Sequence, residues 1–136
     1  MKKFFPFILL LLLMSLKACS PSLEKPYVLS KETEEQLLTF KNKDKFSKQS
    51  WDQRGLMPSP PNVIFQMNNS IHNTVDQILS SKQTLTENNI KKIIRLEMEK
   101  VKMLDTEERE FMGDVFFELS TILNINCQEE INDFMY

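Results

Sequence analysis

The segment SPPNVIFQMNNSIHNTVDQIL, residues 59–79, decides the fold class. Its apolar side chains recur at intervals of three and four residues, which is the period of one face of an α-helix. Ser59 is a natural N-cap residue, and Pro60 suits the first helical position. The segment therefore predicts an amphipathic helix from Pro60 to about Leu79. Its apolar residues are Val63, Ile64, Met67, Ile71, Val75, Ile78 and Leu79.

Two further helices are predicted downstream. Thr86 is a suitable cap for a helix that reaches about Leu104. Asp105 and Glu108 have the spacing of a capping box, which predicts another helix that runs to about Asn124. The apolar residues of these two helices are Ile90, Ile93, Ile94, Leu96, Val101 and Leu104, and then Phe111, Val115, Phe116, Leu119, Ile122 and Leu123.

One helix is predicted upstream, and it begins at Ser30 or at Thr33. In the second case Gln36 would complete a capping box with Thr33. Four amphipathic helices with short connections can bury one common core. The predicted fold class is therefore all-α, a small bundle of about four helices. The tail from Ile125 forms either a short helix or an extended cover. The apolar residues of the first helix are Leu37, Leu38, Phe40 and Phe46.

The beginning of the chain has the layout of a secretory signal peptide. Lys2 and Lys3 precede an apolar run from Phe4 to Met14. The run has 11 residues, whereas a membrane-spanning helix needs about 20. We therefore expect this segment to be a cleaved leader and not a membrane span.

The four residues Leu16-Lys17-Ala18-Cys19 resemble the lipobox of bacterial lipoproteins. The resemblance implies cleavage between Ala18 and Cys19 and attachment of a diacylglyceryl group, with acyl chains such as palmitate, to the sulfur of Cys19. Lys17 departs from the pattern, because this position usually holds a smaller, uncharged residue. The alternative is a plain secretory peptide cleaved after Ala18, with Cys19 an incidental thiol.

Together these predictions divide the chain into three parts: a signal peptide over 1–18, a lipidated tether over 19–29 and a helical domain over 30–136. The expected location is the bacterial cell envelope, on the periplasmic side or at the cell surface. The whole chain has 17 Lys and Arg against 19 Asp and Glu. Loss of three leader lysines would leave 14 basic residues and a charge of -5. Such a charge excludes general attraction to nucleic acid and leaves membrane binding to the lipid.

Groups that could carry catalysis are few. His72 is the only histidine, and Asp76 lies four residues further on; a solvated helix face explains both. Asn69 stands where a di-iron motif would need Glu before His72, so neither a metal site nor a cofactor is predicted. Cys127 follows an apolar pattern and is interpreted as a half-buried small hydrophobe. Acidic residues that could form a catalytic pair are Glu97, Glu99, Glu107, Glu108, Glu110 and Asp114.

Residues 51–62, WDQRGLMPSPPN, are predicted to form a stiff connection. Gly55 can adopt the left-handed conformation that ends a helix. Trp51 either completes the core or lies exposed as a binding anchor beside Arg54, Leu56 and Met57. These four residues are the candidate partner-binding set.

Residue 113 is a glycine within a predicted helix, which suggests close approach by Trp51, another helix or a partner.

Residues 51–60 and the segment DTEEREF, residues 105–111, are similar to an uncharacterised bacterial family of small helical proteins. The resemblance implies a compact helical domain and no known activity.

The sequence supports four functional hypotheses. The first is a lipid-anchored envelope protein that binds another protein through a helix face or the Trp51 segment. A narrower form is an immunity-type inhibitor of a toxin or enzyme, for which the negative charge is the support. The third is a hydrolase-like enzyme that uses His72 or paired carboxylates. The fourth is a purely structural envelope component.

Overall fold

The computed structural model describes residues 24–136 and confirms the all-α prediction. This part of the chain contains six helices and no strand. Four of them correspond to the predicted helices. The short helix of the tail is one of the two alternatives predicted for it, and the short helix that begins at Lys48 was not predicted. The helices are α2 (Lys31–Asn42), α3 (Lys48–Gln53), α4 (Pro61–Ser80), α5 (Glu87–Lys100), α6 (Thr106–Ile122) and α7 (Gln128–Met135).

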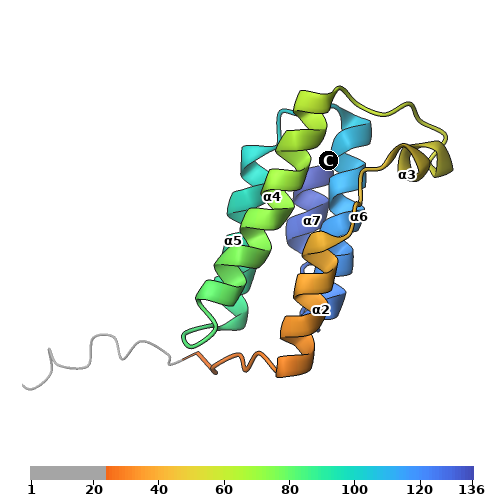
Figure 1. Cartoon of the computed structure of the whole chain (residues 1–136). Coiled ribbons are helices and arrows are strands. Elements are labelled where there is room, and N and C mark those ends of the chain that lie inside the picture. The colour runs from red at the N-terminus through yellow and green to blue at the C-terminus, as the bar shows by residue number, and fades with distance from the viewer. Residues whose placement is uncertain (1–23) are drawn as a thin grey trace, which may run out of the picture.

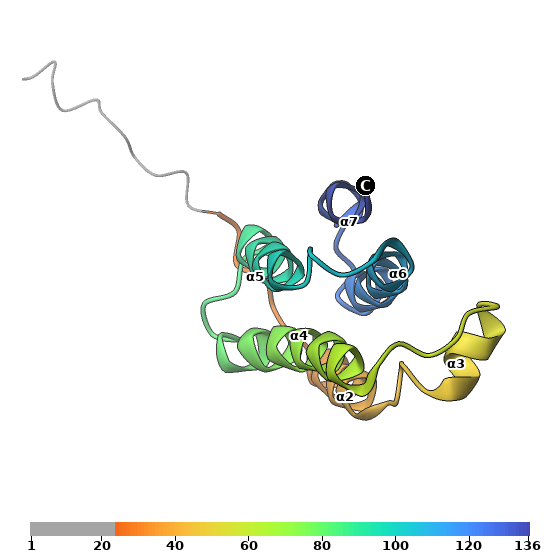
Figure 2. The ribbon, with the colours of Figure 1, turned by 90° about the horizontal axis from the view of Figure 1, so that it is seen from above.

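Five helices form a closed ring around the core. Helix α2 packs against α4 and α6, α5 packs against α4 and α7, and α6 packs against α7 (Figure 2). Helix α3 stands outside this ring. The side chains inside the ring have no exposed surface, which is the packing expected of amphipathic helices that share one core. They include Leu37, Met67, Ile71, Val75, Ile78, Ile90, Ile94, Met112, Phe116 and Leu119.

Two leucines assigned to apolar faces are instead half exposed. Leu38 is exposed by 46% and Leu96 by 50%. Each residue of an α-helix is rotated by about 100° from its neighbour. Since Leu37 and Ile94 already point into the core, Leu38 and Leu96 are turned outward.

Side-chain caps set the first residues of α2 and α5. The Ser30 hydroxyl accepts the backbone N–H of Thr33 at 3.1 Å, so α2 uses the first of the two predicted starts. The predicted box between Thr33 and Gln36 is therefore wrong, because Thr33 already lies inside the helix. Thr86 caps α5 as predicted, and it accepts the N–H of Asn89 at 3.1 Å.

The starts of α6 and α4 are linked. The predicted capping box of α6 is confirmed, and its Glu108 carboxylate accepts the backbone N–H of Asp105 at 2.9 Å. The other oxygen of Glu108 accepts the hydroxyl of Ser59 at 2.6 Å. Ser59 is thus engaged with α6 and does not cap α4. The cap of α4 is Pro60 and its first residue is Pro61, one position later than predicted.

The predicted stiff connection begins inside a short helix. The Ser47 hydroxyl accepts the N–H of Ser50 at 3.2 Å and starts α3, which carries Trp51. Gly55 has a φ of 71°, which confirms its predicted left-handed conformation after the helix. The chain then runs to α4 as an extended, proline-rich loop over 56–60.

The C-terminal tail forms helix α7, the first of its two predicted alternatives. Ile131 and Phe134 are buried against α5 and α6. A Cβ on Gly113 would lie 2.4 Å from Sδ of Met135. The close approach that Gly113 permits is therefore that of α7, and not that of Trp51.

Residues 26–29, which we call the strap, are packed on the domain. The Tyr27 N–H donates to the carbonyl of Leu85 at 2.7 Å, and the Tyr27 hydroxyl donates to the carbonyl of Leu123 at 2.6 Å. Burial raises the pKa of this phenol. The predicted tether ran to Leu29, but from Pro26 onward the chain already belongs to the folded unit, because Tyr27 finds partners there.

Replacing Tyr27 with Phe is expected to lower the free energy of unfolding by about 0.5–1.5 kcal/mol, because the carbonyl of Leu123 loses its donor. Urea denaturation measures this change, and hydrogen exchange at the Tyr27 amide reports release of the strap. Val28, which is 84% exposed, provides the control; Val28→Ala should change neither quantity. An unchanged stability and amide protection in Tyr27→Phe would show that the hydroxyl does not hold the strap.

The strap defines two ends of the ring. The N-terminal segment joins the end that carries the α4–α5 loop and the beginning of α2, whereas α3 and the α3–α4 loop lie at the other end (Figure 1). We call the first the proximal end and the second the distal end. Among residues 24–136 no helix is both long and apolar enough to cross a membrane.

Candidate functional site

An aromatic cluster holds α3 at the distal end. The ring of Phe111 on α6 meets Trp51 edge-on, with centroids 4.9 Å apart, and meets Phe46 edge-on at 5.0 Å. Trp51 is only 1% exposed and Phe46 only 2%. Edge-to-face contacts of this kind add to the stabilisation that burial provides. Trp51 is therefore a core residue, which was one of its two predicted roles.

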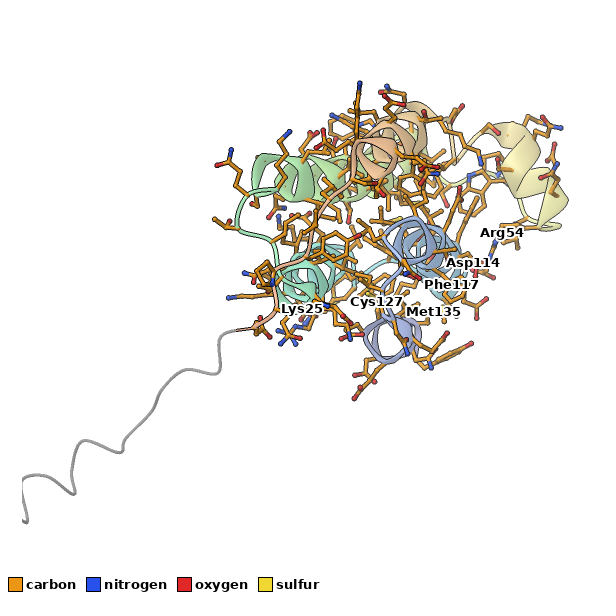
Figure 3. All side chains as sticks on the ribbon, turned by 90° about the horizontal axis from the view of Figure 1, so that it is seen from below. Lys25, Arg54, Asp114, Phe117, Cys127 and Met135 are labelled. Carbon is orange, nitrogen blue, oxygen red and sulfur yellow. The ribbon has the colours of Figure 1, made fainter. Side chains whose placement is uncertain are left out.

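Arg54 covers the outer side of this cluster. Its guanidinium lies over the Phe111 ring, 4.4 Å from the centroid. The same group forms an ion pair with Asp114 at 2.7 Å, and Figure 3 shows these two side chains facing each other. The partner of Asp114 on α6 is thus Arg54, the residue that follows the last residue of α3. This contact fixes the end of α3 on α6.

Two loops meet at the distal end, and both expose a methionine. The bond between Ser59 and Glu108 joins the α3–α4 loop to the start of α6, just after the α5–α6 loop. Met57 in the first loop and Met103 in the second are each 89% exposed. A single exposed apolar residue is normal on a protein surface. Here two such residues lie on loops that meet at the same end of the domain.

The four predicted partner-binding residues differ in how accessible they are to a partner. Trp51 lies in the core and Arg54 pairs with Asp114, so the indole is not an exposed anchor. Leu56 is half-buried against the core. Met57 alone among the four is fully accessible to a partner.

His72 and Asp76, four residues apart on α4, do not form an ion pair with each other. Asp76 instead pairs with Lys41 of α2 at 2.6 Å. His72 is half-buried on α4. A catalytic role for His72 stays a prediction, which the activity of a His72→Ala variant would test.

Several of the predicted acidic residues have structural partners. Glu97 is 1% exposed and accepts a hydrogen bond from Gln77 at 2.7 Å and from Lys100 at 2.5 Å. Its second oxygen is buried without a partner among residues 24–136. Glu99 pairs with Lys102. These contacts stabilise the α4–α5 region.

Cys127 is more deeply buried than predicted, with 1% exposure. Burial is the main reason that the pKa of its thiol rises from 9.0 to about 11. A protonated, covered thiol is a poor nucleophile. Cys127 therefore acts as a small core residue at the start of α7 (Figure 3).

We expect the thiol of Cys127 to react with a disulfide reagent only when the domain unfolds. Because the folded pKa lies above the unfolded one, the stabilisation from the protonated thiol is complete below about pH 9 and is lost as the pH rises towards about 11. Denaturation of the wild type and of Cys127→Ala between pH 8 and 11, the range spanning both values, measures this loss. Equal pH dependence in the two proteins, or rapid labelling of the folded thiol, would contradict the assignment.

Residues 24–136 hold no group of three or more His, Cys, Asp or Glu side chains placed to bind a metal ion. The predicted lipid site Cys19 and the predicted cleavage position after Ala18 lie outside the described residues. The predicted signal peptide over 1–18 lies outside them as well.

The fold and the site define a small all-α domain, a ring of five helices with α3 fixed beside it. The family model of DUF4844, a domain of unknown function, matches residues 28–136. The chain belongs to this family, which confirms the predicted resemblance to an uncharacterised domain. No curated protein matches the chain. No solved structure matches it either.

Sequence reasoning missed the role of three distal residues. Ser59 was interpreted as a cap, and its bond to Glu108 depends on tertiary contact that no local pattern shows. Met103 was not singled out, because it fell inside the helix predicted to reach about Leu104, whereas α5 ends at Lys100 and leaves Met103 in the α5–α6 loop. Ser47 did offer a local signal for α3, since serine is a favoured N-cap.

Proposed function

We propose that this chain is a lipid-anchored protein of the bacterial cell envelope that binds another protein. The leader supports the anchor, because Leu16-Lys17-Ala18-Cys19 has the lipobox pattern behind a basic and apolar segment. Two or more acyl chains are sufficient to hold a protein firmly at a membrane. The family match supports a domain without assigned activity and leaves the function open to this proposal.

The observation that carries the binding role is the division of the domain into two ends. The strap joins the chain to the proximal end, and the exposed methionines lie at the distal end. Six residues, from Ser20 to Lys25, separate the lipid site at Cys19 from the first residue of the strap, Pro26. They reach at most about 25 Å, so a lipid on Cys19 would keep the proximal end near the membrane and present the distal end outward.

An immunity-type inhibitor is a narrower candidate. Residues 24–136 contain 14 Lys and Arg against 19 Asp and Glu, a charge of -5. A groove of about 390 Å³ between α5 and α7 is lined by Glu99, Glu129, Glu130 and Asp133, with Arg95 as its single cation. Such a surface favours a basic partner by charge complementarity. Loss of the partner's activity on binding would support this form, and unchanged activity would remove it.

The experiment is co-purification of the full chain from its own envelope in mild detergent, beside a Cys19→Ala control. We expect one stoichiometric partner protein with the wild type, and membrane partitioning that the control loses. A protein that is acylated but solitary would contradict the binding role. Equal partitioning of the wild type and the Cys19→Ala control with the membrane would contradict the lipid anchor.

A further inference from the structure

We propose that the distal end is a docking surface for a segment of a partner protein that combines apolar side chains with Lys or Arg. The surface consists of Met57, Met103 and the acidic residues at the start of α6. This inference rests on the proposed binding function and names the surface and the chemistry of its partner.

The apolar part of the surface is presented by a rigid base. Trp51 and Phe111 fix α3 from within, and Ser59 with Glu108 joins the two loops. The backbone that carries Met57 and Met103 is therefore fixed on the domain. The 89% exposure of these two side chains is not caused by poor packing beneath them. The methionine side chain is flexible and polarisable, which suits it to apolar partner surfaces.

The charge of this end is the second observation. Asp105 and Glu107 are exposed and Glu110 is half-buried, and none of them forms an ion pair with a basic side chain of residues 24–136. Arg109 forms no ion pair within residues 24–136 and offsets one of these three charges, so the start of α6 keeps a net negative charge. Arg109 is half-buried, with its Nε covered. Lys102 is already paired with Glu99.

An apolar surface with unpaired carboxylates at its edge fits a partner segment with the opposite charge. Complementary charges at the rim steer association and select against acidic partners. A second copy of this chain does not satisfy this condition, because its own distal end carries the same negative charge. An anionic membrane is disfavoured for the same reason.

The test is photo-crosslinking with the full chain in the cells that produce it. A diazirine amino acid replaces Met57 or Met103, and matched controls carry it at Leu38 or Phe117, which are 46% and 50% exposed on α2 and α6. We expect crosslinks to one apolar, Lys- or Arg-containing segment of another protein from the two distal positions, at several-fold higher yield than from the controls. The double variant Glu107→Lys with Glu110→Lys should lower that yield several-fold, while circular dichroism shows that the fold is kept.

The outcomes distinguish a failure of this inference from a failure of the proposed binding function. Partner crosslinks that come mainly from Leu38 or Phe117 would overturn the distal surface and leave the binding function in place. Crosslinks from the distal positions to lipid or to a second copy would also overturn it, as would a yield unaffected by the charge reversal. Absence of protein crosslinks from all four positions would contradict both proposals.

Discussion

Replacing Trp51 with alanine is expected to lower the free energy of unfolding by about 3–5 kcal/mol, the cost typical of removing a buried aromatic side chain. For a domain of this size such a loss lowers the Tm by more than about 10 °C. We expect this loss because Trp51 is 1% exposed and packs edge-on against the ring of Phe111. Its loss would also release α3, and with it the loop that carries Met57.

Thermal denaturation followed by circular dichroism measures this effect. Met57→Ala is the matched control, because Met57 is 89% exposed and its truncation removes little buried surface; it should change the stability by less than about 0.5 kcal/mol. A Trp51→Ala protein with an unchanged midpoint that has lost partner binding would contradict the core assignment. That result would restore the exposed-anchor interpretation of Trp51.

Deleting Gln128–Tyr136 is expected to abolish cooperative unfolding. Helix α7 closes the ring between α5 and α6. It buries Ile131 and Phe134, and each side chain of this kind contributes about 1.5–3 kcal/mol when fully buried. The deletion would also expose the partner faces of α5 and α6. Since small domains are stable by only about 5–15 kcal/mol, a loss of this size is a large part of the total.

Urea denaturation and the dispersion of amide NMR signals test this prediction. Deletion of Tyr136 alone is the control, because this residue is 86% exposed at the end of the chain. The control should unfold like the wild type. A truncated protein that still unfolds cooperatively, with a similar midpoint, would show that α7 is an appendage and that four helices are sufficient for the fold.

The sequence predicted the long helices because their signals are local. The apolar period of residues 59–79 and the cap at Thr86 each act within one or two turns, and they agree with the existence of α4 and with the start of α5. The predicted end of that second helix near Leu104 is wrong, because α5 ends at Lys100. The capping box of Asp105 and Glu108 is equally local. Helix α7 was left open because only eight residues carry its pattern, and its formation depends on the space that Gly113 leaves for Met135.

The distal site could be predicted only in part. The sequence pointed to residues 51–57, but the same aromatic residue suits a core and an interface, and local pattern does not distinguish them. The choice depends on Phe111, which lies 60 residues away in the chain and packs edge-on against Trp51. The contribution of Met103 depends on the bond between Ser59 and Glu108, which is likewise a tertiary contact.

The central claim is that this domain works at a membrane, held there by a lipid on Cys19. The most direct test is the intact mass of the full-length gene product isolated from its own cells, with peptide mapping of the N-terminus. The proposal predicts a chain that begins at Cys19 and carries the added mass of a diacylglyceryl group, which is absent in Cys19→Ala. A chain that begins at Cys19 with a free thiol, or that retains residues 1–18, would contradict it.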